Sequence, residues 1–330
     1  MMKRITGIGN ALTDVLVRLS DERVLNSLAL PKGSMQLIDD SQLPEIRRVL
    51  QTMPMNRATG GSAGNTMLAL ANLGVAPVFI GKVGNDETGR FFADNASEKG
   101  IRPMLVQSNL PSGIAHTFIT ADGERTFATY LGAAGDMQAD DINETMLADC
   151  DYLYIEGYLV QNHALISRAI ELAKAKGAKV CLDLASYNIV AADHAFFSEL
   201  LRDAIDVVFA NEEEAKAFTG TNAEEALYEL GKLCEVAVVK LGKRGSAILY
   251  QGQKTFVESM AVGQVVDTTG AGDFYAAGVM YGILNGWDMV RCAKAGTLLA
   301  GHVIQVVGTT LPVEMWTYIR EELKRMEKEA

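Results

Sequence analysis

Cysteine and histidine are scarce in this 330-residue chain, which contains four of each. The cysteines lie far apart in apolar surroundings without a C-x-x-C pair, so they are predicted to be buried, unreactive thiols. The histidines show no spacing typical of a metal site. The residues concerned are Cys150, Cys181, Cys234, Cys292, His116, His163, His194 and His302. Their scatter argues against a disulfide framework and against a zinc site.

Positive charge is also in short supply, with 30 Lys and Arg against 41 Asp and Glu and a formal net charge of -11. A chain of this charge offers no electrostatic footprint for a nucleic acid. No apolar run is long enough to span a bilayer, and Met1 to Arg4 leads into a predicted strand without the apolar core of a signal peptide. We therefore expect a cytoplasmic protein with no nucleic-acid or membrane partner.

Two glycine-rich nucleotide motifs are missing as well. The chain has no Walker A loop, G-x-x-x-x-G-K-[ST]. Its first predicted strand ends in Gly7-Ile8-Gly9, but the third glycine of a G-x-G-x-x-G fingerprint is absent, and Val15-Leu16-Val17 predicts more strand instead of a helix. A dinucleotide-dependent oxidoreductase is therefore disfavoured, and phosphate binding must depend on another part of the chain.

The most informative stretch runs from Asp267 to Gly278. A predicted strand over Gln264 to Val266 precedes it, and the small and apolar residues from Ala276 to Leu284 predict a buried helix. The first amides of a helix have no partner within it and carry partial positive charge, so the turn Gly270-Ala271-Gly272 can present several N–H groups to an anion. The stretch therefore predicts an anion hole at a helix start.

Asp273 follows that turn directly and admits two interpretations. As an acid in the first helical turn, it would complement the helix dipole. As a carboxylate beside an anion site, it could take the proton from an alcohol that attacks phosphorus, which is the role of a general base in phosphoryl transfer. Asp267, earlier in the turn, is expected to shape the loop or to hold a cation together with neighbouring carbonyls.

Strands and helices alternate along the chain from Tyr152 to Leu241. Such alternation predicts a parallel sheet between two layers of helices, with ligands at the carboxyl ends of the strands. Residues 114–130 alternate on both sides of Asp122-Gly123, which predicts a hairpin. With 48% hydrophobic and 22% charged residues, we expect one α/β domain over residues 1–330.

The segment from Asp267 to Asp273 resembles the second signature of the ribokinase-like, or PfkB, carbohydrate and nucleoside kinases, and Gly60 to Thr66 is similar to their first signature. The resemblance covers essentially the whole chain and looks closest to the adenosine-kinase branch. It implies a three-layer α/β/α sandwich with a mainly parallel central sheet, and a small β-sheet lid contributed by about residues 11–50 and 112–131. It also implies ATP and Mg2+ as cofactors.

In the resemblance, Asp273 matches the catalytic base, and the preceding turn cradles the phosphoryl group in transfer. An aspartate such as Asp14 suits a sugar because its two oxygens can accept from adjacent hydroxyls. Taken alone, a turn residue between strands is the lesser alternative for Asp14, and a glycine-rich helix start is often only a loop. The implied phosphoryl-binding residues are Gly270, Ala271 and Gly272, and the implied substrate-binding residues are Asn10, Asp14, Gly61, Ser62 and Asn65.

Two strand ends resemble the family's nucleotide site. Asn211 and Glu214 match its N-x-x-E motif, which organises Mg2+ and its waters, and Mg2+ tends to keep several waters and take few protein ligands. Gly242 and Gly245 match a nucleotide-binding turn. Lys240 stands where many members have a threonine, so it could meet phosphate directly or point to solvent.

The resemblance also assigns roles to Arg125, Asp267 and Thr269. A lid arginine approaches the transferring phosphoryl group in the adenosine-kinase branch, and a guanidinium suits that task because its donors match two phosphate oxygens. A surface arginine in the lid is the alternative for Arg125. Asp267 and Thr269 lie where the family implies a monovalent cation such as K+.

We therefore predict an ATP-dependent kinase that phosphorylates a primary hydroxyl of a nucleoside or a sugar. A ribokinase- or fructokinase-type sugar kinase is the close alternative, since these enzymes share fold and motifs. A non-catalytic ligand sensor is an alternative of another class, against which the intact Asp273 argues. The chain is expected to be a monomer or a homodimer.

Overall fold

Nine strands form the larger of two sheets in the computed structural model, which describes residues 3–51, 53–121 and 124–328. Their order is β14-β13-β12-β11-β10-β9-β1-β5-β6, and every neighbouring pair is parallel except β12–β13 and β13–β14. The central strands are continuous apolar runs, as expected where both faces of a sheet are covered. The bounds are β1 (Ile5–Ile8), β5 (Val78–Gly84), β6 (Arg102–Ser108), β9 (Tyr152–Glu156), β10 (Lys179–Asp183), β11 (Val207–Asn211), β12 (Val236–Lys240), β13 (Ser246–Tyr250) and β14 (Gln253–Val257).

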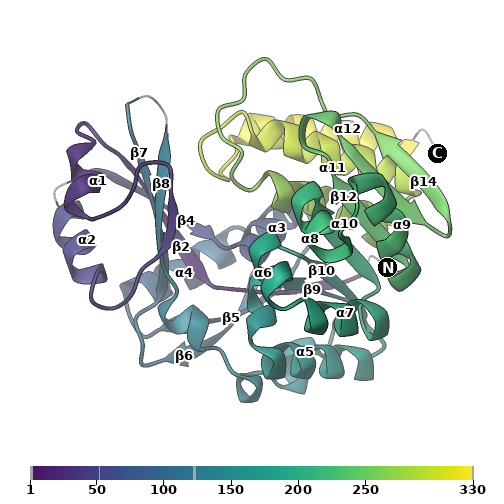
Figure 1. Cartoon of the computed structure of the whole chain (residues 1–330), viewed down its shortest axis with the longest axis horizontal. Helices are drawn as coiled ribbons and strands as arrows, with labels where there is room; N and C mark the ends of the chain where they lie inside the picture. Colours follow the sequence, from purple (N-terminus) through teal and green to yellow (C-terminus); the bar gives the residue numbers. More distant parts are fainter. Residues whose placement is uncertain (1–2, 52, 122–123, 329–330) are drawn as a thin grey trace.

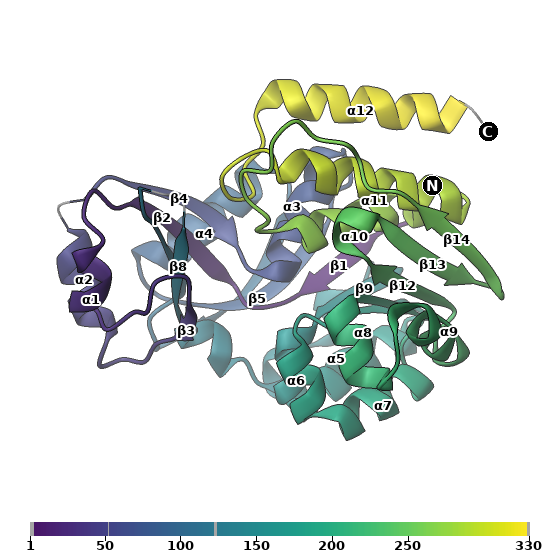
Figure 2. The ribbon, with the colours of Figure 1, turned by 45° about the horizontal axis from the view of Figure 1, so that its top comes forward.

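Two layers of helices enclose this sheet (Figure 1 and Figure 2). Successive strand residues face opposite layers, so that Tyr152 and Tyr154 belong to one hydrophobic cluster and Leu153 and Ile155 to the other. The predicted three-layer α/β/α sandwich is thus confirmed. One layer contains α3 (Ser62–Asn72), α4 (Glu87–Glu98), α10 (Ala271–Leu284), α11 (Met289–Val303) and α12 (Val313–Lys328), and the other contains α5 (His163–Ala175), α6 (Tyr187–Ala192), α7 (His194–Asp203), α8 (Glu212–Thr219) and α9 (Ala223–Leu233).

A second sheet of five strands stands beside the sandwich, in the order β3-β8-β7-β2-β4. β7 and β8 form the antiparallel hairpin that the alternating sequence predicts, and its predicted turn, Asp122-Gly123, lies outside the described residues. β4 lies outside the ranges predicted for the lid, because its sequence does not alternate between apolar and polar residues. The bounds are β2 (Leu12–Arg18), β3 (Met35–Leu37), β4 (Met55–Gly60), β7 (Gly113–Ile119) and β8 (Arg125–Tyr130).

The five-stranded sheet is covered by helices on one face only. α1 (Arg23–Ser27) and α2 (Leu43–Leu50) pack on that face in a hydrophobic cluster that includes Val15, Val17 and Phe118. Residues paired directly across strands share a face, and the register therefore places two rows on the opposite side, which we call the inner face. One row contains Asp14, Ala115, Thr129 and Leu37, and the next contains Leu16, Thr117, Phe127 and Met35.

The segment before α10 differs from its prediction. No strand forms over residues 264–266, where the amides of Val266 and Asp267 instead donate to the carbonyl of Ile304 at 2.7 and 3.2 Å. This segment is held at the C-terminal end of α11, where Ile304 directly follows the helix, so its apolar residues do not join the sheet. α10 begins at Ala271, earlier than predicted, and Asp273 consequently lies in its first turn.

The scarce cysteines behave as predicted: all four are buried and free of disulfides. Burial raises the pKa of the Cys234 and Cys292 thiols to about 12. Among the described residues, no helix is both long and apolar enough to cross a membrane.

Candidate active site

The first turn of α10 presents unpaired amides. Gly270 has a φ of 73°, and a Cβ there would stand 2.5 Å from Cγ2 of Thr309, so the position requires glycine. The amide of Ala271 donates to the carbonyl of Thr268 at 3.2 Å. Within the described part of the chain, the amides of Gly272 and Asp273 have no acceptor and no side chain caps the helix. Such a turn suits an anion.

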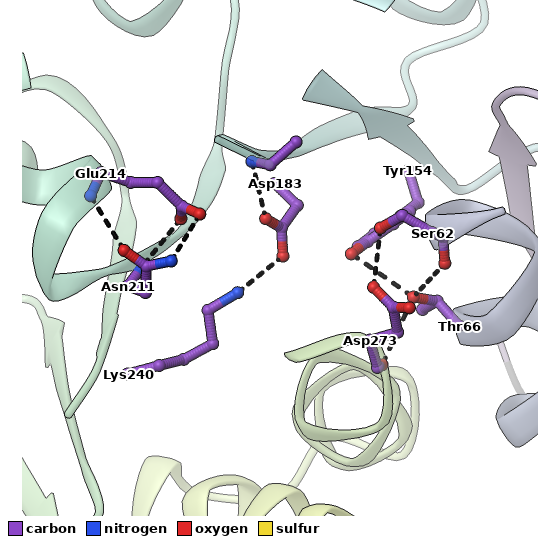
Figure 3. A network of polar contacts seen from close by, with 9 residues as sticks. Ser62, Thr66, Tyr154, Asp183, Asn211, Glu214, Lys240 and Asp273 are labelled. Atoms are coloured by element: carbon purple, nitrogen blue, oxygen red, sulfur yellow. Dashed lines mark hydrogen bonds and ion pairs between the residues drawn. The ribbon is translucent and has the colours of Figure 1, made fainter. Parts of the chain in front are cut away.

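The Asp273 carboxylate lies in the first turn of this helix and is held by two side chains, of which Figure 3 shows Ser62. The hydroxyl of Ser62 donates to Oδ1 at 2.7 Å, and Nδ2 of Asn65 donates to Oδ2 at 2.9 Å. Burial raises the pKa of Asp273 to about 6, although these two hydrogen bonds oppose the shift. Asn65 Oδ1 is buried without a partner among the described residues, so it can accept from a ligand hydroxyl. The arrangement fits a proton acceptor next to a bound alcohol.

The predicted substrate residues of the N-terminal segment meet at the same place. Asp14 is on the inner face of β2, where burial and the charge of Asp273 raise its pKa to about 7. Its carboxylate fills the space that a Cβ on Gly60 would need. Gly61 has a φ of 81° and passes too close to the carbonyl of Asn10 for any side chain. Gly60 and Gly61 thus let the end of β4 approach Asp14 and Asn10 closely.

A buried glutamate that the sequence reasoning missed fixes Asn10. Glu156, at the end of β9, accepts from Nδ2 of Asn10 at 2.6 Å and from the amide of Ala63 at 3.0 Å. Burial raises the pKa of Glu156 to about 7. Its position at the carboxyl end of a buried strand was the available signal, because ligands of open α/β sheets bind at that edge.

Lys240 and a second unpredicted acid, Asp183, lie on the other side of Asp273 (Figure 3). Lys240 Nζ is 2.9 Å from Oδ2 of Asp183, and their side chains are 15% and 5% exposed. The same ammonium stands 3.2 Å from the position that a Cβ on Gly272 would take. Of the two orientations that the sequence left open for Lys240, the structure shows the one that points toward the α10 turn.

Asn211 and Glu214 are occupied by a mutual capping arrangement at the start of α8. Asn211 Oδ1 accepts from the amide of Glu214 at 2.9 Å, while the carboxylate of Glu214 accepts from the amide and Nδ2 of Asn211 at 2.7 and 2.6 Å. Glu214 is buried, which raises the pKa of its carboxyl to about 7. These contacts fit a magnesium ion held through water better than one bound directly. Among the described residues, no three His, Cys, Asp or Glu side chains form a metal-binding group.

Arg125 connects the five-stranded sheet to the turn before α10. Its guanidinium forms an ion pair with Oδ1 of Asp267, and NH1 is 3.2 Å from Oγ1 of Thr269. Asp267 also accepts from the amides of Thr269 and Gly308 at 2.9 and 2.6 Å, and these partners hold its pKa below its usual value although burial opposes them. Arg125 is thus an inward-facing residue at the turn before α10.

Gly242 and Gly245 lie in the turn after β12, with φ values of 56° and 104°. A Cβ on Gly245 would collide with the backbone of Val257 and Glu258, so this glycine is needed for the turn itself. Among the described residues, neither glycine forms a hydrogen bond with the cluster around Asp273. Their predicted contact with a nucleotide stays a prediction.

A sizeable cavity lies away from this site. It has a volume of about 620 Å3 and lies outside the inner face, between α2 and the start of α4, with Arg47, Arg57 and His116 among its lining residues. None of the predicted site residues lines it. The candidate active site is therefore defined by its hydrogen-bond network and not by cavity size.

The chain matches the pfkB family carbohydrate kinase over residues 34–316. It is similar to the structure of adenosine kinase from Sinorhizobium meliloti, with 33% identity and a TM-score of 0.86 over 98% of this chain and 100% of that one. A probable sugar kinase protein from Rhizobium etli has 31% identity and a TM-score of 0.86 over 98% and 99%. The 5-dehydro-2-deoxygluconokinase of Geobacillus thermodenitrificans is 27% identical over 307 residues, which are 88% of this chain and 90% of that protein.

These matches, together with the fold and the site, define an ATP-dependent kinase of the sugar and nucleoside class. Kinases of this class bind a sugar or nucleoside and use ATP with Mg2+. The chain belongs to the pfkB family of carbohydrate kinases, as its two signature segments predict.

Proposed function

We propose that this protein transfers the γ-phosphoryl group of ATP to a primary hydroxyl of a nucleoside, with Asp273 as the general base. The observation that carries the proposal is the position of the Asp273 carboxylate, within one helical turn of two unpaired amides and held by Ser62 and Asn65. A base and an anion site at this separation can act on one alcohol and one phosphoryl group at once.

The reaction follows from these neighbours. Asp14 and Asn65 Oδ1 orient the acceptor, Asn10 and Gly61 shape its site, and the acceptor oxygen attacks the γ-phosphorus while its proton passes to Asp273. The bond between the γ-phosphorus and the bridging oxygen breaks, and ADP leaves. The amides of the Gly270 to Asp273 turn and the Arg125 guanidinium stabilise charge on the phosphoryl oxygens. Mg2+, organised through water by Asn211 and Glu214, supplies further charge neutralisation when bound.

The inner face favours an acceptor with an uncharged, apolar part. Met35 and Leu37 are 69% and 70% exposed, and Met35 shares its row with Phe127 and Leu16. Apart from Asp14, neither of these two rows carries a charged side chain. Arg18 and Arg125 lie in the next row of the same face, through Ile119, and Arg125 is paired with Asp267. A nucleoside presents a ribose to Asp14 and an apolar base to the remaining residues. This chemistry supports a nucleoside acceptor.

A sugar or sugar acid is the second candidate. The relatives named 5-dehydro-2-deoxygluconokinase favour it, since they match most of the chain. Such an acceptor would place a carboxylate near the inner face, where Arg125 is already paired with Asp267. A ribokinase- or fructokinase-type acceptor would leave the exposed Met35 and Leu37 without a partner.

A coupled assay of ADP release tests the proposal. Mg-ATP is supplied with adenosine, other nucleosides, ribose, fructose or 5-dehydro-2-deoxygluconate, each with and without K+. We expect the highest kcat/KM for a nucleoside. A preference for a free sugar or a sugar acid would overturn the nucleoside assignment and leave the kinase mechanism standing. Tight acceptor binding without ADP release would instead favour the non-catalytic sensor.

The K+ arm addresses the predicted cation site at Asp267 and Thr269. Both oxygens of Asp267 already accept from Arg125 or from backbone amides. A monovalent cation would therefore have to bind through neighbouring carbonyls or displace Arg125. Activation by K+ over Na+ at equal ionic strength would support the site.

The role of the five-stranded sheet is part of the same proposal. We propose that residues 1–330 act as one domain in which this sheet is a lid, closing over the acceptor through Arg125 and so limiting ATP hydrolysis. Light scattering of the purified chain, with and without the acceptor, distinguishes a monomer from a homodimer.

A further inference from the structure

A buried ion pair lies in the site without a role in the mechanism above. Lys240 is the last residue of β12, and Asp183 is the last residue of β10, two strands away in the sheet. Their side chains meet over the intervening strand, with Nζ and Oδ2 2.9 Å apart. In Figure 3, the pair lies between Asn211 and Glu214 on one side and Asp273 on the other.

The Lys240 ammonium also lies close to the turn at the start of α10. It stands 3.2 Å from the position of a Cβ on Gly272, so a larger residue at 272 would crowd it. The amide of Gly272 is one of the two that have no acceptor in the described structure. Lys240 therefore adds a positive charge at the same turn as the unpaired amides.

The surroundings keep this ammonium charged. Burial alone would lower the pKa of Lys240, but Asp183, Glu214 and Asp273 raise it above its ordinary value. Buried ion pairs contribute little to stability, because the cost of removing both charges from water offsets their attraction. A pair that only joined β10 to β12 could be replaced by apolar residues without loss. Its place beside the unpaired amides points to a ligand instead.

We propose that Lys240 binds the non-bridging oxygens of the γ-phosphoryl group, and that Asp183 is a positioning residue that aims Lys240 at the α10 turn. This inference rests on the proposed function. The ammonium donates hydrogen bonds to the phosphoryl oxygens and keeps its own protons, while the acceptor proton goes to Asp273. A lysine suits the space left by Gly272 because its ammonium is a compact point charge.

Calorimetric titration of three nucleotides tests the phosphate contact without an acceptor. The probes are AMP, ADP and the non-hydrolysable β,γ-imido analogue of ATP, each with Mg2+. For Lys240→Met, we expect affinity for the imido analogue to fall at least about tenfold and affinity for AMP to stay unchanged. Equal losses for all three nucleotides, or no loss for any, would overturn the proposal.

The alternative that the pair is only structural is tested with Asp183→Asn and the double variant Asp183→Asn/Lys240→Met. If the pair only joins two strands, the double variant, which leaves no unpaired buried charge, regains activity lost in the single variants. If Lys240 acts on phosphate, kcat in the double variant stays as low as in Lys240→Met, about 10²-fold below the unmodified protein. Should Lys240→Met fail to fold, the double variant carries the same nucleotide test.

A matched control exists at the opposite ends of the same elements. Lys179, the first residue of β10, pairs with Glu235, directly before β12, at 2.5 Å. Lys179→Met breaks this ion pair away from Asp273 and should leave the nucleotide preference unchanged. If the unmodified protein binds the imido analogue and Lys240→Met binds it equally well, only this inference fails. If the unmodified protein binds no ATP analogue and phosphorylates no acceptor, the proposed function fails with it.

Discussion

The two sheets bring side chains to the site in different ways. The nine-stranded sheet is covered on both faces, and its contributions come from strand ends: Glu156 from β9, Asp183 from β10 and Lys240 from β12. The five-stranded sheet is covered on one face, and its contributions come from the middle of strands on the free inner face, such as Asp14 and Phe127. A sheet enclosed by helices offers only its edge to ligands, whereas a half-covered sheet offers a surface.

This difference separates two tasks. Asp273 and Lys240, which are assigned to proton and phosphoryl transfer, are held by hydrogen bonds to buried or half-buried neighbours in and beside the nine-stranded sheet. Of the groups assigned to the acceptor, Asp14, Met35 and Leu37 lie on the five-stranded sheet, which Arg125 joins to the turn before α10. We therefore expect substitutions in the framework to change kcat, and substitutions on the inner face to change which acceptor is used.

The largest effect is expected for Asp273→Asn. The amide cannot accept the acceptor proton, so kcat should fall by about 10²- to 10⁴-fold. Affinity for the ATP analogue, measured by calorimetry, should change little because the turn amides remain. Unchanged kcat would refute the base assignment. It would also remove the contrast between a nine-stranded sheet that serves catalysis and a five-stranded sheet that selects the acceptor.

A stability measurement controls for unfolding in that variant. Burial holds the pKa of Asp273 near 6 against an ordinary 3.8, so the folded protein binds this proton more tightly than the unfolded chain. The resulting stabilisation is present below pH 3.8 and is lost as the pH rises through about 6. At pH 8, the free energy of unfolding of Asp273→Asn should therefore exceed that of the unmodified protein by up to about 3 kcal/mol, and at pH 3.8 the two should be similar.

Arg125→Ala should have the next largest effect, because Arg125 belongs to one sheet and acts at the other. Loss of its charge from the phosphoryl group should lower kcat by about 10²-fold. Arg18→Ala is the matched control, since Arg18 lies in the same inner-face row through Ile119 but is exposed at the end of β2. Similar steady-state kinetics for both variants would show that Arg125 does not act on the phosphoryl group.

The pH dependence of kcat/KM should reveal the ionisation of one carboxylate from each region, Asp273 and Asp14. Asp273 must be ionised to act as base, so its protonation should contribute about a tenfold fall in kcat/KM per pH unit below pH 6. Asp14, with a pKa of about 7, must be ionised to accept from two hydroxyls and should add a second break. In Asp14→Asn, we expect only the break near 6 to remain. A profile that Asp14→Asn does not alter would contradict the assignment of Asp14.

The smallest effect is expected on the inner face. Met35→Gln and Leu37→Gln should each lower kcat/KM for a nucleoside about three- to tenfold, because they remove apolar contact with the base. Turnover of ribose should change little. Val313→Gln, at a residue that is 73% exposed on α12, is the matched control. Equal losses for nucleoside and ribose would mean that the inner face does not select the base.

Much of the fold could be predicted from local pattern. The helices Glu212–Thr219 and Ala223–Leu233 lie in the stretch where the sequence predicts alternating strands and helices, because caps and apolar periodicity lie within a few residues of each helix. The α10 turn was predictable for the same reason, since its glycines and Asp273 are consecutive. The strand predicted at residues 264–266 was wrong, because a short apolar run looks like a strand in the sequence even when its amides pair with another part of the chain.

The sequence by itself determined the alternation of strands and helices, the glycine turn at the start of α10 and the residue types beside it, since each depends on neighbours along the chain. Only the tertiary structure decided which side chains pair at the strand ends. Asp183 and Lys240 are 57 residues apart, and Asn10 and Glu156 are 146 apart. No local preference encodes such a pair, because it forms only when the order of the strands in the sheet brings the two ends together.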